Sequence, residues 1–354
     1  MKWTITKKEA LLVKNLLQLT GKKLLLYHND PDGICSAALL LKFFTGFETM
    51  PRKGPLMDEE FTKSLIEKKP ELIVFLDIPV DQERKMLKKL FKALPDLRIL
   101  ILDHHIPEKN LNSENIVHIN PRFKNKDLYI PTSGMVYVLL KKLRYKVTHL
   151  VWMAAVGIIG DYGTEDCKDI IEECKEEYPY LLEEDPMTSP LAEVAKLISS
   201  AVTLKGLKGA ATALKVLSLY DYFDDFIKVE KLQRWKGMVE KEINRLLEEF
   251  ERGKERKGDV IFYKIETKLN LTSVISTILS EKYQKEIIVI RKKSSKGWKI
   301  SVRNQSGDYN VGELVKRAVQ GIGSGGGHEK AAAGIISKWR EFKRKFLEEI
   351  RKNS

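Results

Sequence analysis

The sequence predicts an α/β protein of two domains, the first of which is built on a mainly parallel sheet. Three continuous apolar runs, at residues 24–27, 72–76 and 98–102, alternate with segments of helical periodicity. Such runs are typical of strands buried on both faces, as in parallel sheets covered by helices on either side. Each run is followed at once by polar residues that can bind metal. A chain of 354 residues also exceeds the usual size of a single hydrophobic core.

The first domain is predicted over residues 1–225. Apolar residues at helical spacing predict a helix at 8–19, ahead of the first strand. Residues 28–33 are interpreted as a turn that leads into a helix at 36–44. The remaining elements expected in this domain are a helix at 81–94, a strand at 116–119, a helix at 134–140 capped by Thr132 and Ser133, an apolar helix at 149–159, an acidic surface segment at 166–185 and a helical segment at 191–219.

The densely charged segment 226–257 is predicted to be a helix that connects the two domains. The second domain, at 258–354, is expected to be a smaller α/β unit. Its predicted elements are strands at 260–265, 287–290 and 298–302, helices at 271–279 and 311–319, a small-residue helix at 331–334 and a basic amphipathic helix at 339–351.

The formal net charge of +13 favours a polyanionic partner such as nucleic acid, because basic residues that neutralise phosphates release bound counterions. A Lys-rich proteome would also make its proteins basic, so the charge alone leaves both interpretations open. No apolar run is long enough to cross a bilayer, and the N-terminus lacks a signal-peptide cleavage region. We therefore expect a cytoplasmic protein with no membrane partner.

The turn after the first apolar run carries three possible metal ligands, His28, Asp30 and Asp32, at alternate positions. Carboxylates packed this closely repel one another, and a bound cation would offset that cost. The alternative is a solvated Asp-Pro-Asp-Gly turn, which is common between secondary-structure elements. The ends of the other strands decide between the two.

The second and third apolar runs also end in metal-binding residue types. Asp77 follows the second run, Asp103, His104 and His105 follow the third, and Asp161 lies between two glycines after the helix at 149–159. Because the carboxyl ends of parallel strands lie at one edge of a sheet, we expect these side chains to meet there. Mixed carboxylate and imidazole ligands suit Mn²⁺, with Mg²⁺ and Co²⁺ as alternatives. So many ligands indicate two ions with a bridging carboxylate, a common device for hydrolysing phosphate esters.

A glycine-rich run at 321–328 forms the second candidate site. It contains G-x-G-x-x-G formally, but it does not follow a predicted strand, and we reject a dinucleotide-binding motif. Its exposed backbone N–H groups could wrap a phosphate beside the imidazole of His328. The alternative is a flexible linker, which rarely ends in histidine and a run of small residues.

The order and spacing of these motifs resemble the DHH phosphoesterase superfamily, which includes RecJ-type exonucleases, nano-RNases and family II pyrophosphatases. The similar motifs are His28-Asn29-Asp30-Pro31-Asp32-Gly33, Asp77, Asp103-His104-His105 and Gly160-Asp161. The segments Gly325-Gly326-Gly327-His328 and Ser301-Val302-Arg303 resemble the DHH-associated C-terminal domain of RecJ and nano-RNases. Family II pyrophosphatases carry a different second domain, which argues against that activity.

The resemblance implies a role for each matching residue. One ion would be held by His28, Asp30 and Asp77, and the other by Asp32, Asp77, His104 and Asp161, with Asp77 as the bridge. Asp103 would orient an imidazole, and His105 would contact the scissile phosphate; a strand-end cap and a surface histidine are the alternatives for these two residues. Arg303, Gly325, Gly326, Gly327 and His328 would bind the nucleotide from the second domain.

The function implied is that of a Mn²⁺-dependent exonuclease or oligoribonuclease that hydrolyses single-stranded or short oligonucleotides to nucleoside monophosphates. Alternatives within the enzyme class are a cyclic dinucleotide phosphodiesterase and a nucleoside bisphosphate phosphatase. The alternative of another class is a subunit of a nucleic-acid-processing complex that acts mainly through partner binding. Single-stranded nucleic acid is the expected partner, with replication or RNA-decay proteins and a second copy of the chain as further candidates.

Overall fold

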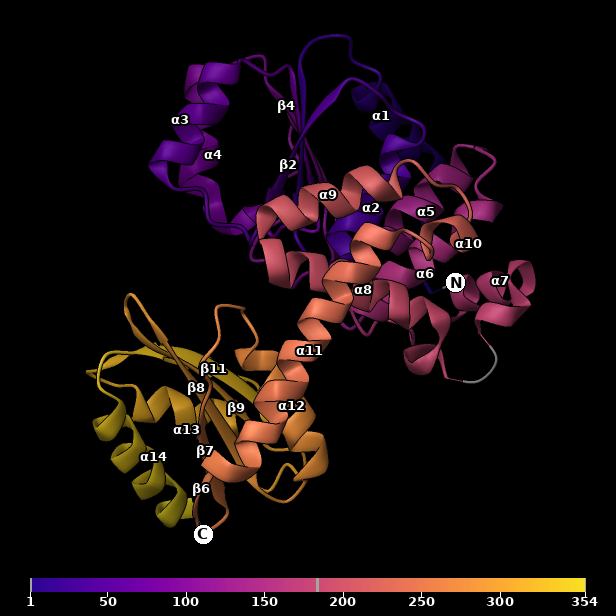
Figure 1. The fold of residues 1–354 in the computed structure, drawn as a ribbon. Coiled ribbons are helices and arrows are strands. Elements are labelled where there is room, and N and C mark those ends of the chain that lie inside the picture. Colours follow the sequence, from indigo (N-terminus) through magenta and orange to yellow (C-terminus); the bar gives the residue numbers. More distant parts are fainter. Residues whose placement is uncertain (1, 183–184, 354) are drawn as a thin grey trace. The chain divides into compact units, whose positions relative to one another are not determined.

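The computed structural model describes residues 2–182 and 185–353 (Figure 1). The chain divides into two compact units, Met1–Lys236 and Gly237–Ser354. Helix α11, Glu230–Gly253, begins in the first unit and ends in the second. The predicted acidic segment at 166–185 forms helix α7 in part, while its residues 183 and 184 lie outside the described residues.

The N-terminal unit contains a sheet of five parallel strands, which confirms the predicted α/β class. Its order is β2-β1-β3-β4-β5. The strands are β1 Lys23–His28, β2 Phe47–Arg52, β3 Leu72–Leu76, β4 Arg98–Leu102 and β5 Ile116–Ile119. Strand β2 was not predicted, because it lies at an edge of the sheet, is largely polar and contains Pro51.

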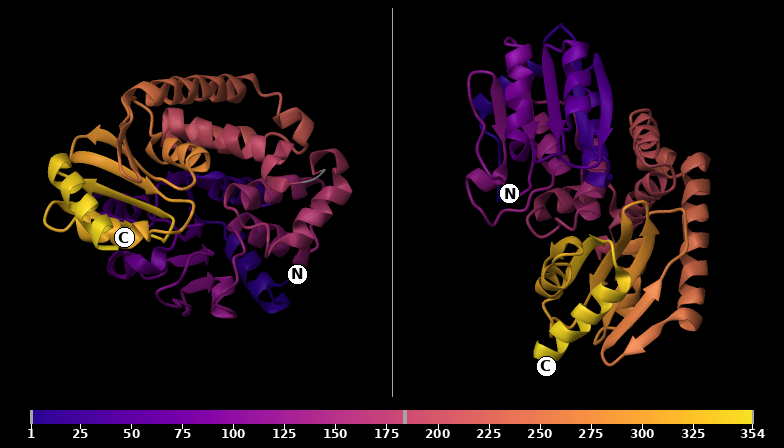
Figure 2. Two further views of the ribbon diagram at one scale, coloured as in Figure 1. Left: turned by 90° about the horizontal axis from the view of Figure 1, so that it is seen from below. Right: turned by 90° about the vertical axis from the view of Figure 1, so that its left-hand side faces the viewer.

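Helices cover both faces of this sheet, so the unit has three layers (Figures 1 and 2). Successive strand residues point to opposite faces: Leu25 and Val74 join the core that contains α1, α2 and α5, whereas Leu24 and Ile73 join the core beneath α3 and α4. The helices are α1 Lys7–Leu17, α2 Pro31–Leu41, α3 Glu59–Lys68, α4 Arg84–Ala93, α5 Thr132–Lys142, α6 Val151–Gly160, α7 Lys168–Glu177, α8 Pro190–Lys205, α9 Leu207–Leu217 and α10 Phe223–Phe226.

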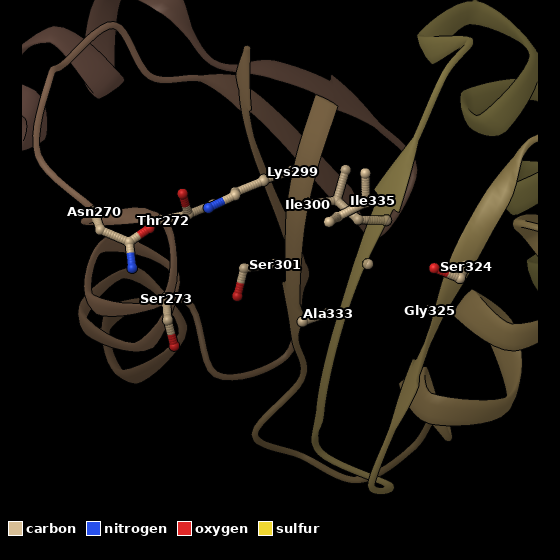
Figure 3. Close-up of a pocket in the computed structure, with 11 residues that line it drawn as sticks. Asn270, Thr272, Ser273, Lys299, Ile300, Ser301, Ser324, Gly325, Ala333 and Ile335 are labelled. Atoms are coloured by element: carbon tan, nitrogen blue, oxygen red, sulfur yellow. The ribbon is translucent and has the colours of Figure 1, made fainter. Parts of the chain in front are cut away.

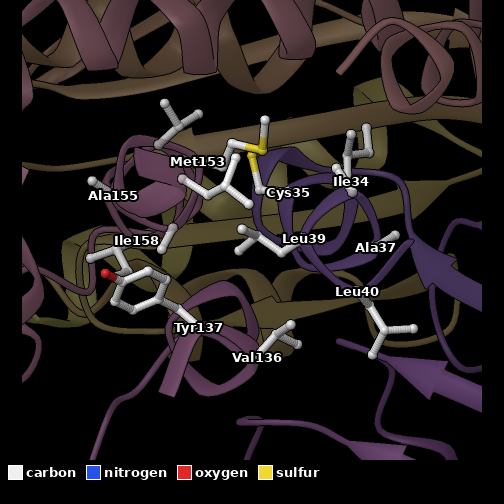
Figure 4. Close-up of a cluster of buried hydrophobic side chains, with 14 of the residues drawn as sticks. Ile34, Cys35, Ala37, Leu39, Leu40, Val136, Tyr137, Met153, Ala155 and Ile158 are labelled. Atoms are coloured by element: carbon white, nitrogen blue, oxygen red, sulfur yellow. The ribbon is translucent and has the colours of Figure 1, made fainter. Parts of the chain in front are cut away.

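Helices α2, α5 and α6 pack on one another through fully buried side chains, and this packing holds the elements that carry the site (Figure 4). Leu39 of α2, Tyr137 of α5 and Ile158 of α6 each expose at most 1% of their surface. Helix α6 is apolar on all sides, because it is enclosed by α2, α5, α7 and α8. The C-terminal end of α6 is therefore held firmly beside the start of α2.

The C-terminal unit contains a mixed sheet of six strands in the order β10-β11-β9-β8-β7-β6. Helices α13 and α14, the latter yellow in Figure 2, share a core with one face of this sheet. Helix α12 packs against β8 and β9 on the other face, where Ser276 and Ser301 are hydrogen-bonded through their hydroxyls. The elements after α11 are β6 Glu255–Lys257, β7 Val260–Lys264, α12 Thr272–Lys282, β8 Ile287–Ser294, β9 Gly297–Arg303, α13 Val311–Ala318, β10 Gly323–Gly327, β11 Ala331–Ile336 and α14 Trp339–Asn353.

The predicted helix at 331–334 is wrong, since these residues belong to strand β11. The glycine run is not a loop either, because Gly323–Gly327 forms the edge strand β10, paired with β11. A Cβ atom at Gly327 would lie 2.2 Å from Ala331 O, and its φ of 157° disfavours other residues. Strand β11 pairs with β10 on one side and β9 on the other, and this pairing overrides the helical preference of its consecutive alanines.

Two further predictions were wrong in detail. Helix α2 begins at Pro31 rather than Ser36, so most of the predicted turn is the first turn of the helix. Helix α5 begins at Thr132, and Pro131 rather than Thr132 occupies its N-cap. The segment at 191–219 is helical as predicted, and Gly206, at a φ of 60°, divides it into two helices.

Candidate metal centre

Three neighbouring strands of the N-terminal sheet bring candidate ligands to one edge. Strand β1 ends at His28, Asp77 follows β3, and His104 lies just beyond β4. Because β1, β3 and β4 are adjacent and parallel, their carboxyl ends lie side by side. The expected convergence of these residue types at one sheet edge therefore follows from the topology.

Asp30 and Asp32 reach this edge from the start of α2. Asp30 is the N-cap of the helix, and its Oδ1 accepts a hydrogen bond from Gly33 N at 2.9 Å. Its other oxygen lies 2.5 Å from His28 Nδ1. The cap therefore uses one oxygen of Asp30 and leaves the other for the site.

Asp77 is the centre of the cluster. Its Oδ2 lies 3.3 Å from His28 Nδ1, and its Oδ1 lies 3.1 Å from His104 Nε2. The residue is buried and has a φ of 59°, a left-handed conformation that Asp adopts more readily than most residues. This conformation turns the chain at the strand end and directs the carboxylate between the two imidazoles.

Asp32 is held by backbone that is distant in sequence. Its two oxygens accept hydrogen bonds from Thr132 N at 2.7 Å and Ser133 N at 2.8 Å, at the first turn of α5. Gly157 of α6 allows this arrangement, because a Cβ there would lie 2.3 Å from Ser133 Oγ and 3.0 Å from Asp32 Oδ1. The start of one helix thus fixes a carboxylate that belongs to another.

Asp161 caps the C-terminal end of α6, and its Oδ2 lies 3.2 Å from His104 Nε2. The same oxygen accepts a hydrogen bond from the hydroxyl of Tyr129 at 2.7 Å. Tyr129 also meets the ring of His104 edge-on, at 5.0 Å between ring centres. One tyrosine therefore contacts two residues of the cluster.

The ligand atoms form three groups in which all atoms lie within 4.8 Å of one another. The groups are His28, Asp30 and Asp77; Asp32, His104 and Asp161; and Asp77, His104 and His105. Asp77 and His104 each belong to two groups, and of these two residues Asp77 has the carboxylate that could bridge two ions. His28 Nδ1 and Asp77 Oδ1 are buried and lie within 3.3 Å of polar atoms of the cluster, but neither forms a hydrogen bond of normal geometry with a described residue. Oxygen and imidazole donors in this arrangement fit divalent cations such as Mn²⁺.

The protonation equilibria of the cluster also favour a cation. Burial, followed by the charge of Asp77, raises the pKa of the Asp32 carboxyl well above its usual range, and burial raises that of Asp161 as well. Burial opposes ionisation of Asp77, but its contacts with His104 and His28 hold its pKa below the usual range. Burial lowers the pKa of His104, yet Asp77 outweighs it and raises the value to about 10. Without a metal ion, the carboxyl groups of Asp32 and Asp161 therefore tend to bind protons.

Asp103 and His105 lie beside this cluster and form a pair of their own. Asp103 Oδ1 lies 2.8 Å from His105 Nδ1, and Asp103 is almost fully buried. The side chain of His105 is 40% exposed, so its other nitrogen is open to a ligand. Burial lowers the pKa of His105, but Asp103 outweighs it and raises the value above the ordinary one.

A groove of about 450 Å³ lies within the C-terminal unit (Figure 3), and of the five candidate residues of the second domain it is lined by Gly325 and not by Arg303, Gly326, Gly327 or His328. Gly325 and Ser301 line it, and Lys299 extends into it from β9. Arg303 Nη2 donates a hydrogen bond to Ser273 Oγ, which also lines the groove, at 2.9 Å. His328 is exposed in the turn between β10 and β11.

Several residues of these sites were not predicted. Thr132 and Ser133 were expected as helix caps, but their backbone N–H groups bind Asp32 instead. Tyr129 lies in a loop, and no local pattern indicates that its hydroxyl meets Asp161. Lys299 could have been found from the alternation of β9, which places it on the same face as Ser301.

We expect the substitution Tyr129→Phe to weaken Mn²⁺ binding by roughly 10-fold, because residues that orient metal ligands typically contribute this much to affinity. Calorimetric titration with Mn²⁺ measures the effect. Tyr137→Phe is the matched control, since its hydroxyl binds Glu173 outside the cluster. Equal affinity in the wild-type and Tyr129→Phe proteins would show that Tyr129 does not orient Asp161.

Comparisons with known proteins match both units. Residues 23–158 match the family model of the DHH family N-terminal domain, and residues 258–353 match that of the DHHA1 domain. Among curated proteins, no match to this sequence was found.

Solved structures share the fold at low sequence identity. The structure of RecJ from Thermus thermophilus in complex with Mn²⁺ superimposes with a TM-score of 0.76 at 16% identity, over 98% of this chain and 54% of that chain. The chain thus spans about half the length of that protein. An exonuclease RecJ bound to manganese gives a TM-score of 0.73 at 18% identity, over 98% and 94% of the two chains. The DHH domain of a member of the s1p family of ribosomal proteins gives 0.72 at 18% identity, over 97% and 89%.

The family models and the structural likeness agree with the geometry of the ligand cluster. Each unit matches its own domain model, and the two domains occur in the order expected from the sequence. The metal-binding residue types lie where the DHH model matches or directly after it. The chain belongs to the DHH superfamily of metal-dependent phosphoesterases, with a DHH domain followed by a DHHA1 domain.

Proposed function

We propose that the chain is an exonuclease or oligoribonuclease that hydrolyses single-stranded or short oligonucleotides to nucleoside monophosphates. The observation that carries the proposal is the cluster at the sheet edge, in which Asp77 shares one group of metal-binding atoms with His28 and Asp30 and another with His104 and His105, while His104 shares a third with Asp32 and Asp161. Such sharing supports two ions, for which Mn²⁺ is the expected metal and Mg²⁺ and Co²⁺ are alternatives. His28, Asp30 and Asp77 would hold one ion, and Asp32, Asp77, His104 and Asp161 the other.

Bound divalent ions would supply Lewis acidity to the phosphate and an activated water. The protein's own contribution beside them comes from Asp103 and His105. Asp103 fixes the ring of His105 through Nδ1, which directs Nε2 to the open side of the pair. We propose that His105 donates a hydrogen bond from Nε2 to an oxygen of the scissile phosphate. Asp103 is then a positioning residue, in keeping with its burial.

The C-terminal unit is proposed to bind the remainder of the nucleotide through Arg303, the strand Gly325-Gly326-Gly327 and His328. The groove supports this proposal, because Lys299 has no carboxylate partner among residues 2–182 and 185–353. Lys299 also faces Lys292 directly across β8 and β9, and like charges in such a pair are destabilising. A bound phosphate would relieve this repulsion.

The proposal is tested with end-labelled RNA and DNA oligonucleotides of graded length, incubated with Mn²⁺, Mg²⁺ or Co²⁺. We expect ladders that end in nucleoside monophosphates, and they will also show the polarity, sugar preference and length limit. Parallel reactions with a cyclic dinucleotide and a nucleoside bisphosphate test the alternative substrates. Hydrolysis of either of these without cleavage of the oligonucleotides would overturn the proposed substrate class.

We expect Arg303→Gln to raise KM for a short oligonucleotide by roughly 10- to 100-fold, because a charge-assisted hydrogen bond to phosphate contributes about 1.5–3 kcal/mol. The value of kcat should change much less, since Arg303 would bind a part of the substrate away from the reacting bond. Steady-state kinetics at saturating metal separate the two constants. Arg317→Gln is the control, because Arg317 lies on α13 and pairs with Glu349. A fall in kcat with unchanged KM would contradict a binding role for Arg303.

The remaining expectations concern location and partners. No helix among the described residues is long and apolar enough to cross a membrane. A cytoplasmic location, replication or RNA-decay proteins as partners, and self-association stay predictions. Fractionation and size measurement of the purified protein test the first and the last of them.

A further inference from the structure

A second pocket, of about 760 Å³, lies on the opposite face of the C-terminal sheet from the groove. Arg291 pairs in register with Ile300, whose side chain joins the core formed with α13 and α14. Ser301 points to the other face, where it contacts α12 and lines the groove. The pocket is bounded by β7, β8, β9 and the first turns of α14. It is therefore separate from the groove assigned to the substrate in the proposed function.

The pocket is built around the guanidinium group of Arg291. This group lies 4.6 Å from the ring centre of Trp298 and 4.2 Å from that of Trp339. Two indoles thus hold one planar cation by cation–π attraction. Trp339 is itself braced by Phe262 and Phe342, at 5.7 Å between ring centres in both cases. Such packing fixes the orientation of Arg291 before any ligand arrives.

Arg291 has no partner that satisfies its N–H groups. Within the described ranges, 2–182 and 185–353, no side chain or carbonyl accepts a hydrogen bond from it, and no carboxylate pairs with it. Glu255 influences it electrostatically, but that carboxylate is paired with Lys343 at 2.5 Å. Burial lowers the pKa of Arg291. A half-buried guanidinium with unused donors is costly unless an anion binds it.

Further cations surround Arg291. Arg340 lines the pocket, is exposed, and forms no ion pair among the residues that the structure describes. Lys264 and Lys338 also line it, although they lie near Glu266 and Glu341 respectively. Most of the chain's formal charge of +13 falls within residues 237–354, whereas the first unit is nearly balanced. The pocket is thus a cationic and aromatic site in the basic part of the protein.

We propose that this pocket binds the phosphate backbone of single-stranded nucleic acid, at a place apart from the groove. The free edge of a fixed guanidinium matches two phosphate oxygens, and Arg340 can neutralise a neighbouring phosphate. The flanking indoles favour nucleic acid over an acidic peptide, because cationic grooves with aromatic side chains are typical of single-strand binding. The identity of the polyanion rests on the proposed function, but the site does not depend on the metal cluster.

The test is the binding of a dye-labelled single-stranded oligonucleotide by the full chain in EDTA, followed by fluorescence anisotropy at several salt concentrations. We expect Arg291→Gln and Arg340→Gln each to weaken binding, with affinity reduced about 10-fold for Arg291→Gln. Each variant should also lower the salt dependence by roughly 0.7 in log–log slope for each phosphate that is no longer neutralised. Arg344→Gln is the control, since Arg344 lies on α14 outside the pocket and pairs with Glu348.

Two comparisons separate this inference from the proposed function. Cleavage of a dinucleotide in Mn²⁺ should be unchanged in Arg291→Gln and Arg340→Gln, because so short a substrate would not reach the pocket. A second outcome is that the wild-type protein binds the oligonucleotide but does not cleave it, while both variants lose binding. That outcome would overturn the nuclease function and support the pocket. Wild-type affinity and salt dependence in both variants would overturn the pocket as a nucleic-acid site. So would equal competition by polyglutamate, which would indicate an acidic protein partner.

Discussion

Asp77→Asn is expected to lower kcat/KM for an oligonucleotide by roughly 1000-fold, because the bridging carboxylate would hold both ions and several kcal/mol of catalytic stabilisation depend on them. Asn has the same shape as Asp and tolerates the positive φ of 59° at this position. The substitution therefore removes the charge and leaves the backbone conformation accessible. Hydrolysis assays and calorimetric titration with Mn²⁺ measure the two losses.

Asp58→Asn provides a matched control for this experiment. Asp58 is the N-cap of α3 and accepts a hydrogen bond from Phe61 N at 2.8 Å, a role that Asn fills equally well. The control thus removes one carboxylate charge from the same unit without touching the cluster. Turnover by Asp77→Asn at the rate of the control, with Mn²⁺ still bound, would refute the central place given to Asp77.

Removal of both divalent ions is expected to abolish turnover and to lower the melting temperature of the N-terminal unit by roughly 10–20 °C. A ligand present at 100 times its Kd stabilises the folded state by about 2.7 kcal/mol per site, and each kcal/mol corresponds to roughly 2–4 °C for a unit of this size. The physical reason is that the buried Asp32 and the half-buried Asp30 and Asp161 lie near Asp77, where their charges repel unless a cation is bound. Thermal melting in EDTA and after addition of Mn²⁺ measures the shift.

The Asp77→Asn protein is again informative, because its melting temperature should respond little to Mn²⁺. A chelated wild-type protein that regains both stability and turnover on addition of Mn²⁺ would agree with the two-ion site. If EDTA changed neither property, the cluster would be a buried network of hydrogen-bonded acids rather than a metal centre.

The sequence alone placed the candidate ligands at the carboxyl ends of three strands, and the topology explains why this succeeded. His28, Asp77 and His104 each follow an apolar run long enough to be a buried strand. Parallel strands joined by helices must present their carboxyl ends at one edge, so local patterns were sufficient to bring these residues together. The sequence also pointed to the glycine run at 321–328 as a candidate site. It did not predict that part of this run is a strand, because that conformation depends on pairing with β11.

Tertiary structure decided the features that depend on partners distant in the chain. Asp32 is oriented by Thr132, 100 residues away, and Asp161 by the hydroxyl of Tyr129. The indoles around Arg291 come from β9 and α14, which the hydrophobic core of the C-terminal unit brings together. Local sequence determines which residues end a strand or helix, because those signals are periodic and short-range. It does not determine which side chains and backbone groups meet across the fold, since those contacts form only when the helices and sheets pack.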